Sequence, residues 1–152
     1  MANTQAMCTS FMQEILTATH NFTTGTGDSF KAALYLASAT VNASTTVYST
    51  TGEVTGTNYS PGGVAVTNGT SPLSSNTSAT AGVAYWTPTA SLTYTNVTLT
   101  TAFDAVLIYN SSKSNKAVSV HTFGSQTVTA GTFTLTMPSN TTSTALLRLA
   151  TT

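Results

Sequence analysis

Charged residues are what this sequence has least of. Lys, Arg, Asp and Glu together make up 5% of its 152 residues, whereas about 25% is usual for a globular domain. Four basic and four acidic side chains give a formal net charge of zero. So few basic residues exclude the positive patch that binds nucleic acid and the cationic face that binds anionic lipid. We therefore expect neither nucleic acid nor a membrane among the partners.

Cysteine is nearly absent as well, since Cys8 is the only one. A single thiol cannot form an internal disulfide, and there is no cysteine pair that could bind a metal. No apolar run reaches the roughly 18–20 residues of a membrane-spanning helix. The first residues show neither a basic leader nor a continuous apolar core, so we expect no signal peptide.

Threonine, by contrast, fills about a quarter of the chain. A neutral surface rich in hydroxyl groups lacks the charge that keeps a small protein soluble as a separate monomer. The composition therefore predicts a surface that is largely covered by partners, including copies of the same chain.

One helix is predicted at the N-terminus, over about residues 4–20. Apolar residues recur there at four-residue intervals in two neighbouring rows, which are Met7, Phe11 and Ile15, and Cys8, Met12 and Leu16. Together they form the apolar stripe of an amphipathic helix, with Asn3 or Thr4 as the capping residue. We expect Met7, Phe11 and Ile15 to contact a sheet or a neighbouring subunit.

The rest of the single domain, about residues 29–150, is predicted to be strands and turns. "SFKAALYLAS" is apolar in both of its alternating rows, which is typical of a strand covered on both faces. "VAVTNGTSPLS" contains Asn68-Gly69, the favoured pair of a type I′ hairpin turn, and an exposed loop is expected near residues 69–83. "TALLRLA" is predicted to be an edge strand. Strands spaced in this way favour an antiparallel β-sandwich or barrel-like fold.

The segment "DAVLIYNSSKSNKAVSV", residues 104–120, reads as a hairpin. Its two strands, 105–109 and 117–123, flank turn-forming residues. Lys113 and Lys116 then lie at the hairpin tip, where a charged side chain needs no partner. The alternative is a tip that touches a neighbouring subunit.

Ionisable side chains are few and dispersed. The carboxylates and histidines fall in separate expected elements: Glu14, Asp28, Glu53, Asp104, His20 and His121. Glu53 suits a solvated loop, His20 the end of the helix, and His121 a partly buried, hydrogen-bonded position on a strand. The serines lack the signature of a nucleophile elbow. We expect no catalytic residue, no metal and no cofactor.

Tyr85 and Trp86 are the one aromatic pair that suggests a ligand. Followed by Pro88, they could form a platform for a carbohydrate ring. Packing in the core or in an interface is the alternative, because buried aromatic side chains commonly serve that purpose.

The order of several segments resembles a known family. "SFMQEILTATHNF", "FKAALYLASATV", "YSTTGEVTGTNYSPGG", "DAVLIYNSSKSNKAV" and "AGTFTLTMPSNTTSTALLRLA" together resemble small virion structural proteins of tailed bacteriophages. The resemblance covers nearly the whole chain, and residues 69–83 depart most from the family pattern. It implies a non-enzymatic particle component that is made in the host cytoplasm and built into virions, in the head or in the tail.

Composition and resemblance together predict a phage structural protein. We favour a capsid decoration or cement protein that oligomerises on the major capsid protein, because a short neutral chain gains stability from surface buried against its neighbours. A tail tube, adaptor or fibre-associated component is one alternative. A carbohydrate-binding module displayed on the virion is another.

Overall fold

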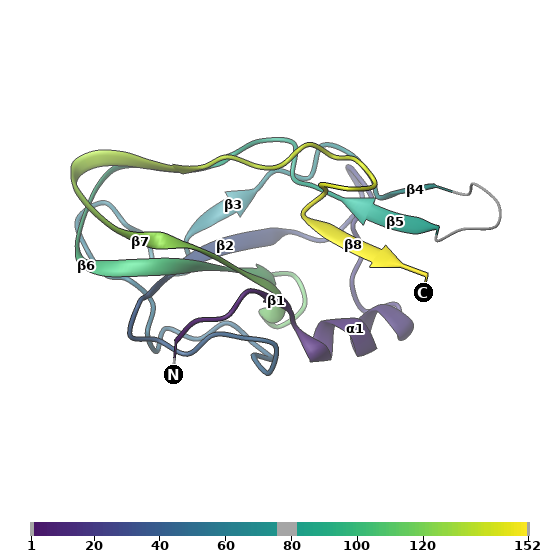
Figure 1. Cartoon of the computed structure of the whole chain (residues 1–152), viewed down its shortest axis with the longest axis horizontal. Helices are drawn as coiled ribbons and strands as arrows, with labels where there is room; N and C mark the ends of the chain where they lie inside the picture. Colours follow the sequence, from purple (N-terminus) through teal and green to yellow (C-terminus); the bar gives the residue numbers. More distant parts are fainter. Residues whose placement is uncertain (1, 76–81, 152) are drawn as a thin grey trace.

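The computed structural model describes residues 2–75 and 82–151, which form two antiparallel sheets and one short helix (Figure 1). The larger sheet has the order β1-β7-β6-β2-β3 and the smaller the order β4-β5-β8. The elements are β1 (Ala6–Met7), α1 (Thr9–Leu16), β2 (Phe30–Leu36), β3 (Val64–Val66), β4 (Leu73–Ser75), β5 (Val83–Trp86), β6 (Leu92–Asn110), β7 (Lys116–Leu135) and β8 (Leu147–Ala150). The predicted mainly β, sandwich-like fold with one N-terminal helix is confirmed.

Strand β2 lies at the centre of the core. It pairs with β6 along one edge and with β3 along the other. Both of its faces are largely buried, and Ala32, Ala33 and Leu34 are fully so. The continuous apolar sequence of this strand therefore reflects cover on two sides, as predicted.

Strands β6 and β7 form one long hairpin that is strongly bent. The register pairs Phe103 with Gln126 and Tyr94 with Phe133. In a straight strand, Phe103 and Tyr94 would lie about 30 Å apart, at roughly 3.3 Å per residue. Yet the rings of Phe103 and Phe133 meet edge to face at 5.0 Å. The far half of the hairpin thus folds back over the five-stranded sheet and supplies part of the second layer (Figure 1).

Irregular backbone conformations produce this bend. The β6–β7 register shifts repeatedly between Tyr94 and Ala105. Asn96 and Ala130 have positive φ angles of 52° and 46°, which strand residues rarely adopt. The register shift beyond Tyr94 also changes which residues of β6 point toward the core. Val97 and Leu99 are therefore buried where strict alternation from Leu92 would expose them.

The helix is much shorter than predicted. Residues 6–7 are a strand that pairs with β7, because an unpaired sheet edge satisfies their backbone groups better than a helical turn exposed to water. Asn3 caps nothing; its side chain instead bonds the Leu36 carbonyl, the Val41 N–H and Asp104. The helix begins after Cys8, which makes no side-chain cap, and ends before Ala18, whose φ is 54°.

The turn predicted at Asn68-Gly69 is also wrong. A type I′ turn needs a positive φ at both central residues, and neither residue has one. Strands β3 and β4, which flank the pair, belong to different sheets. The loop expected near 69–83 is interrupted by β4 at Leu73–Ser75 and ends at β5; its part at 76–81 lies outside the described residues. Within the described chain, no helix has the length and hydropathy to cross a membrane.

Candidate functional site

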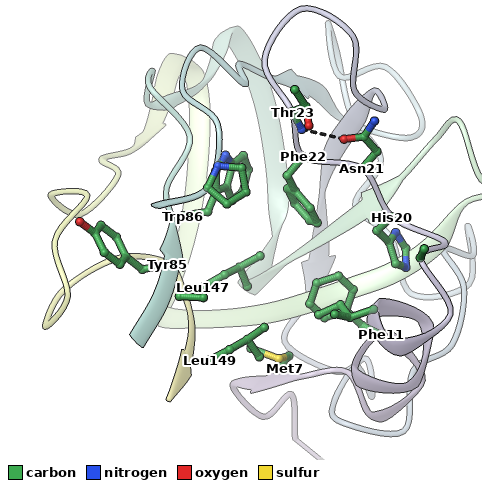
Figure 2. A pocket seen from close by; sticks show the side chains of 14 residues that line it. Met7, Phe11, His20, Asn21, Phe22, Thr23, Tyr85, Trp86, Leu147 and Leu149 are labelled. Atoms are coloured by element: carbon green, nitrogen blue, oxygen red, sulfur yellow. Dashed lines mark hydrogen bonds between the residues drawn. The ribbon is translucent and has the colours of Figure 1, made fainter. Parts of the chain in front are cut away.

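An apolar cleft of about 460 Å³ opens between the N-terminal elements and the smaller sheet. Figure 2 shows Phe11 on one side of it and Leu147 on the other, and Met7 and Leu149 also line it. Its volume lies within the roughly 300–1,000 Å³ of typical binding sites. Five of the seven residues predicted to mediate interactions border the cleft, namely Met7, Phe11, Ile15, Tyr85 and Trp86.

Strand alternation decides which side chains of the smaller sheet face the cleft. Leu147 lies opposite Trp86, and Leu149 lies opposite Ala84. Directly opposed residues share a face, so these four side chains line one surface. Tyr85 belongs to the other face because successive strand residues point in opposite directions, and its ring points away from the cleft in Figure 2.

This alternation corrects the idea of an aromatic platform. Tyr85 and Trp86 project from opposite faces of β5, so they cannot stack on one sugar ring. Trp86 is buried, and its indole N–H donates to the Asn68 amide oxygen (3.0 Å) and the Thr70 carbonyl (3.1 Å). The alternative reading of core packing therefore describes Trp86.

The floor of the cleft is a chain of aromatic rings. The Phe11 ring lies 4.9 Å from the ring of His20, and Phe22 lies 4.9 Å from Trp86 and stacks on Phe30 at 4.3 Å. The Asn68 amide N–H₂ donates to the Phe22 carbonyl (2.8 Å). Asn68 therefore joins Phe22 to Trp86 and fixes the floor. No pattern in the sequence indicates this role, because Asn68 and Gly69 look like an ordinary turn.

The helix presents its two predicted apolar rows differently. Phe11 is buried and Ile15 is partly buried against the core, as predicted, although Met7 comes from β1 rather than from the helix. In the second row only Cys8 is buried, and burial raises the pKa of its thiol to about 12, with a smaller contribution from the charge of Glu14. Met12 and Leu16 are exposed, and neither lines the cleft.

A polar network lies behind the aromatic floor. The His20 ring is completely buried, and its Nδ1 accepts from the Asn110 amide (2.9 Å), which leaves the Nε2–H to donate to Glu14 (2.7 Å). The other Glu14 oxygen accepts from Lys116. Burial opposes ionisation of Glu14, but Lys116 and His20 outweigh it and lower the pKa of the carboxyl.

The prediction that the two lysines lie at a solvated tip without partners is therefore wrong. Lys116 bonds Glu14 of α1, and the Lys113 ammonium lies 3.6 Å from Asp28. Asp28 also accepts from the Asn21 N–H and the Asn110 amide; although burial opposes its charge, these partners and Lys113 lower its pKa. Both lysines hold the hairpin to the N-terminal segment, and each keeps a partly exposed side chain.

Glu53 is the clearest error among the predicted ionisable positions. It is buried, not solvated. One of its oxygens accepts from Tyr59 (2.8 Å) and the Gly62 N–H (2.7 Å), and the other accepts from Tyr48 (2.6 Å). Burial first, and then the charge of Glu53, raise the pKa of both tyrosines. The carboxylate fixes the loop between β2 and β3 against the sheet.

His121 lies on β7 as predicted, partly buried and bonded to the Ser119 hydroxyl (2.9 Å). Burial lowers the pKa of its imidazole to about 4. It lies away from His20, which has both ring nitrogens engaged. In the described parts of the chain, no three His, Cys, Asp or Glu side chains are grouped so that they could hold a metal ion.

The chemistry of this surface is thus that of apolar contact. The cleft borders carry no Lys, Arg, Asp or Glu side chain. The adjacent strand β8 is an outer strand of its sheet, as predicted, and no other strand of the described chain pairs with its second edge. No protein-family model, no curated protein and no solved structure matches this chain.

Proposed function

We propose that this protein is a non-enzymatic structural subunit of a tailed-phage virion, namely a capsid decoration or cement protein that oligomerises. The observation that carries the proposal is an open apolar cleft beside an outer strand in a nearly uncharged chain. Such a surface loses contact with water when a neighbouring subunit covers it, which favours association.

The edge of β8 adds a second means of attachment. Thr151 donates its N–H to the Gly82 carbonyl (3.0 Å), so alternation along an antiparallel pair turns the backbone groups of Arg148 and Ala150 outward. Outward N–H and C=O groups accept a neighbour's strand. A subunit held by apolar and backbone contacts fits a particle lattice and needs few charges.

Two other functions have less support. An enzyme needs an accessible group that transfers a proton or attacks a substrate, but the histidine beside the cleft is buried with both nitrogens bonded. The main argument for a carbohydrate-binding module fails, because Tyr85 and Trp86 lie on opposite faces of β5 and form no shared platform. A tail component uses the same kind of contact and differs only in its place in the particle.

The test is to locate the chain in particles of a phage that encodes it. Antibody labelling and a density map of gradient-purified particles should place it at regular positions on the head surface. Labelling confined to the tail would replace the decoration role with the tail role. Absence of the chain from the particles would overturn the proposal.

A further inference from the structure

Asn68 and Gly69 form the only Asn-Gly pair in the sequence. Asparagine loses its side-chain amide most readily when glycine follows it, because glycine has no side chain to hinder attack by its own backbone nitrogen on the neighbouring amide carbon. The pair forms no type I′ turn here, so turn geometry does not explain why this reactive combination is present. The reason lies in the contacts that the two residues make.

Gly69 is required by its close contact with Thr89. A Cβ at position 69 would lie 2.5 Å from the Thr89 Oγ1 and 3.2 Å from the Thr89 Cβ. The Thr89 N–H (3.0 Å) and hydroxyl (3.2 Å) both donate to the Thr67 carbonyl, and the same hydroxyl accepts from the Gly69 N–H (3.1 Å). The peptide groups on both sides of Asn68 are therefore fixed to Thr89.

The Asn68 side chain is held separately, by the aromatic floor of the cleft. Its amide oxygen accepts from the Trp86 indole N–H (3.0 Å), and its N–H₂ donates to the Phe22 carbonyl (2.8 Å). Deamidation requires the Gly69 nitrogen to reach the amide carbon, so both the side chain and the peptide group must leave their present hydrogen bonds. The folded chain therefore opposes the reaction, which proceeds from locally opened forms.

We propose that Asn68 is a deamidation site that the fold protects, and that its conversion to an acid releases the aromatic floor of the cleft. In the opened form the Gly69 nitrogen bonds to the Asn68 Cγ, the bond from Cγ to the side-chain nitrogen breaks, and the Gly69 amide proton ends on the ammonia that leaves. Water then opens the succinimide ring at either carbonyl and gives aspartate or isoaspartate. Nothing is oxidised or reduced, and the step is independent of the proposed role in a virion.

An acid at position 68 cannot hold Phe22. A carboxylate has only acceptors, so its oxygen would face the Phe22 carbonyl where the amide now donates. Isoaspartate also adds a methylene to the backbone, which displaces the peptide groups from Thr89. Phe22 stacks on Phe30 and meets the Trp86 ring at 4.9 Å, so its release loosens the floor. The reaction thus makes a reversible local opening permanent.

The first experiment follows deamidation of the full chain by peptide mass spectrometry in mildly alkaline buffer, with and without concentrated urea. The acid should accumulate at position 68 more than about tenfold more slowly in the folded protein, because only the minor open form reacts. Thr89→Val removes the hydroxyl that holds Gly69, whereas Thr89→Ser keeps it, and the position is exposed. The valine protein should react faster than the serine protein when folded and at the same rate in urea.

The second experiment measures the consequence for the floor. Trp86 is the only tryptophan, so its emission should shift to longer wavelength as the acid accumulates in the wild-type protein. Asn68→Asp should unfold at a lower urea concentration than Asn115→Asp, which makes the same change of charge at an exposed position.

Four results would overturn the proposal. They are no acid at position 68 in urea, equal rates in folded and unfolded chains, equal rates for the two folded Thr89 variants, and a modified protein whose emission is unchanged. An Asn68→Asp protein that fails to fold would agree with the proposal, and the emission of the ageing wild-type protein would still test it.

Discussion

Phe11 makes the central contact between the short helix and the rest of the molecule. Its side chain is 1% exposed, and its ring meets those of His20 and Phe22. Replacing Phe11 by Ala should lower the free energy of unfolding by about 3–5 kcal/mol, because it leaves a cavity in the aromatic floor. Urea unfolding measures the loss, with exposed Gln13→Ala on the same helix as the control. A loss below about 0.5 kcal/mol, the usual surface scale, would contradict the described packing.

His121 should make stability depend on pH in a defined window. Burial lowers its pKa from 6.5 to about 4 in the folded protein, so above pH 6.5 both states hold the neutral ring and its contribution is fully present. As the pH falls below 6.5, the unfolded chain binds a proton that the folded chain rejects, and stability falls. We expect a loss of about 2 kcal/mol by pH 4.5.

The pH range of this loss distinguishes the effect of His121 from that of the carboxylates. Glu14 and Asp28 have lowered pKa values, so their stabilising effect is lost only below their ordinary values of 4.5 and 3.8. For the His121→Gln protein, the free energy of unfolding in urea should depend less on pH between 7.5 and 4.5, because glutamine does not titrate. Its amide can still bond Ser119, so the local contact is kept. An unchanged slope would mean that another group is responsible.

Residue-level predictions from the sequence succeeded where a local pattern determined burial. Phe11 and Cys8 were recognised from helical spacing, and His121 from its place on an apolar strand. The predicted exposure of Glu53 is wrong because a carboxylate in a polar loop is normally exposed, whereas this one is buried. Its burial depends on two tyrosines and a backbone N–H that converge only in the folded chain.

At the scale of the elements, the bend of the β6–β7 hairpin is the feature that most shapes the fold. The sequence predicts the tip of this hairpin, with strands at 105–109 and 117–123, but not the bend, because the bend arises from backbone conformations that an apolar pattern does not encode. The same reason explains the shortened helix: residues 6–7 have helical spacing, yet their backbone pairs with β7. Tertiary pairing here overrides a local preference.

Ala130 offers a test of this bend. It is exposed and has a φ of 46°, a conformation that glycine adopts freely and β-branched residues do not. Ala130→Gly should therefore be more stable than Ala130→Val, by about 1 kcal/mol or more. Exposed Ala102 on β6 has no positive φ, so there the order should reverse, since valine favours strands and glycine weakens them. Thermal unfolding of the four proteins checks both orders; the same order at both sites would contradict the described bend.

At the scale of the whole molecule, the few charges serve internal contacts. Lys116 pairs with Glu14 and Lys113 with Asp28, while Arg148 donates to the Thr142 carbonyl (2.7 Å). Whether the residues predicted to mediate interactions do so stays a prediction, but the structure shows where they lie. Met7, Phe11, Ile15 and Trp86 do meet at one cleft, but the lysines hold the hairpin in place, since their partners come from distant parts of the chain.

This distribution of charge leads to a prediction about attachment to a particle. Exposed ion pairs contribute about 0–1 kcal/mol each, and most of the charged groups here already have partners within the chain. Attachment by the proposed subunit should therefore depend on apolar area, at roughly 25 cal/mol per Å², and on backbone hydrogen bonds such as those offered by β8. Salt weakens only charge–charge attraction, with a Debye length that falls to about 3 Å at 1 M.

Raising NaCl to about 1 M, where charges beyond about 3 Å are screened, should consequently leave the protein on purified particles. Mild guanidinium thiocyanate or heat should release it, because both weaken apolar and peptide contacts. The measurement is to pellet the particles after each treatment and quantify the chain in the supernatant, with Lys113→Ala as a variant that removes one partly exposed charge. Release by NaCl alone would show that Lys31, Lys113, Lys116 or Arg148 binds the lattice directly, and the hairpin tip would then be a docking element.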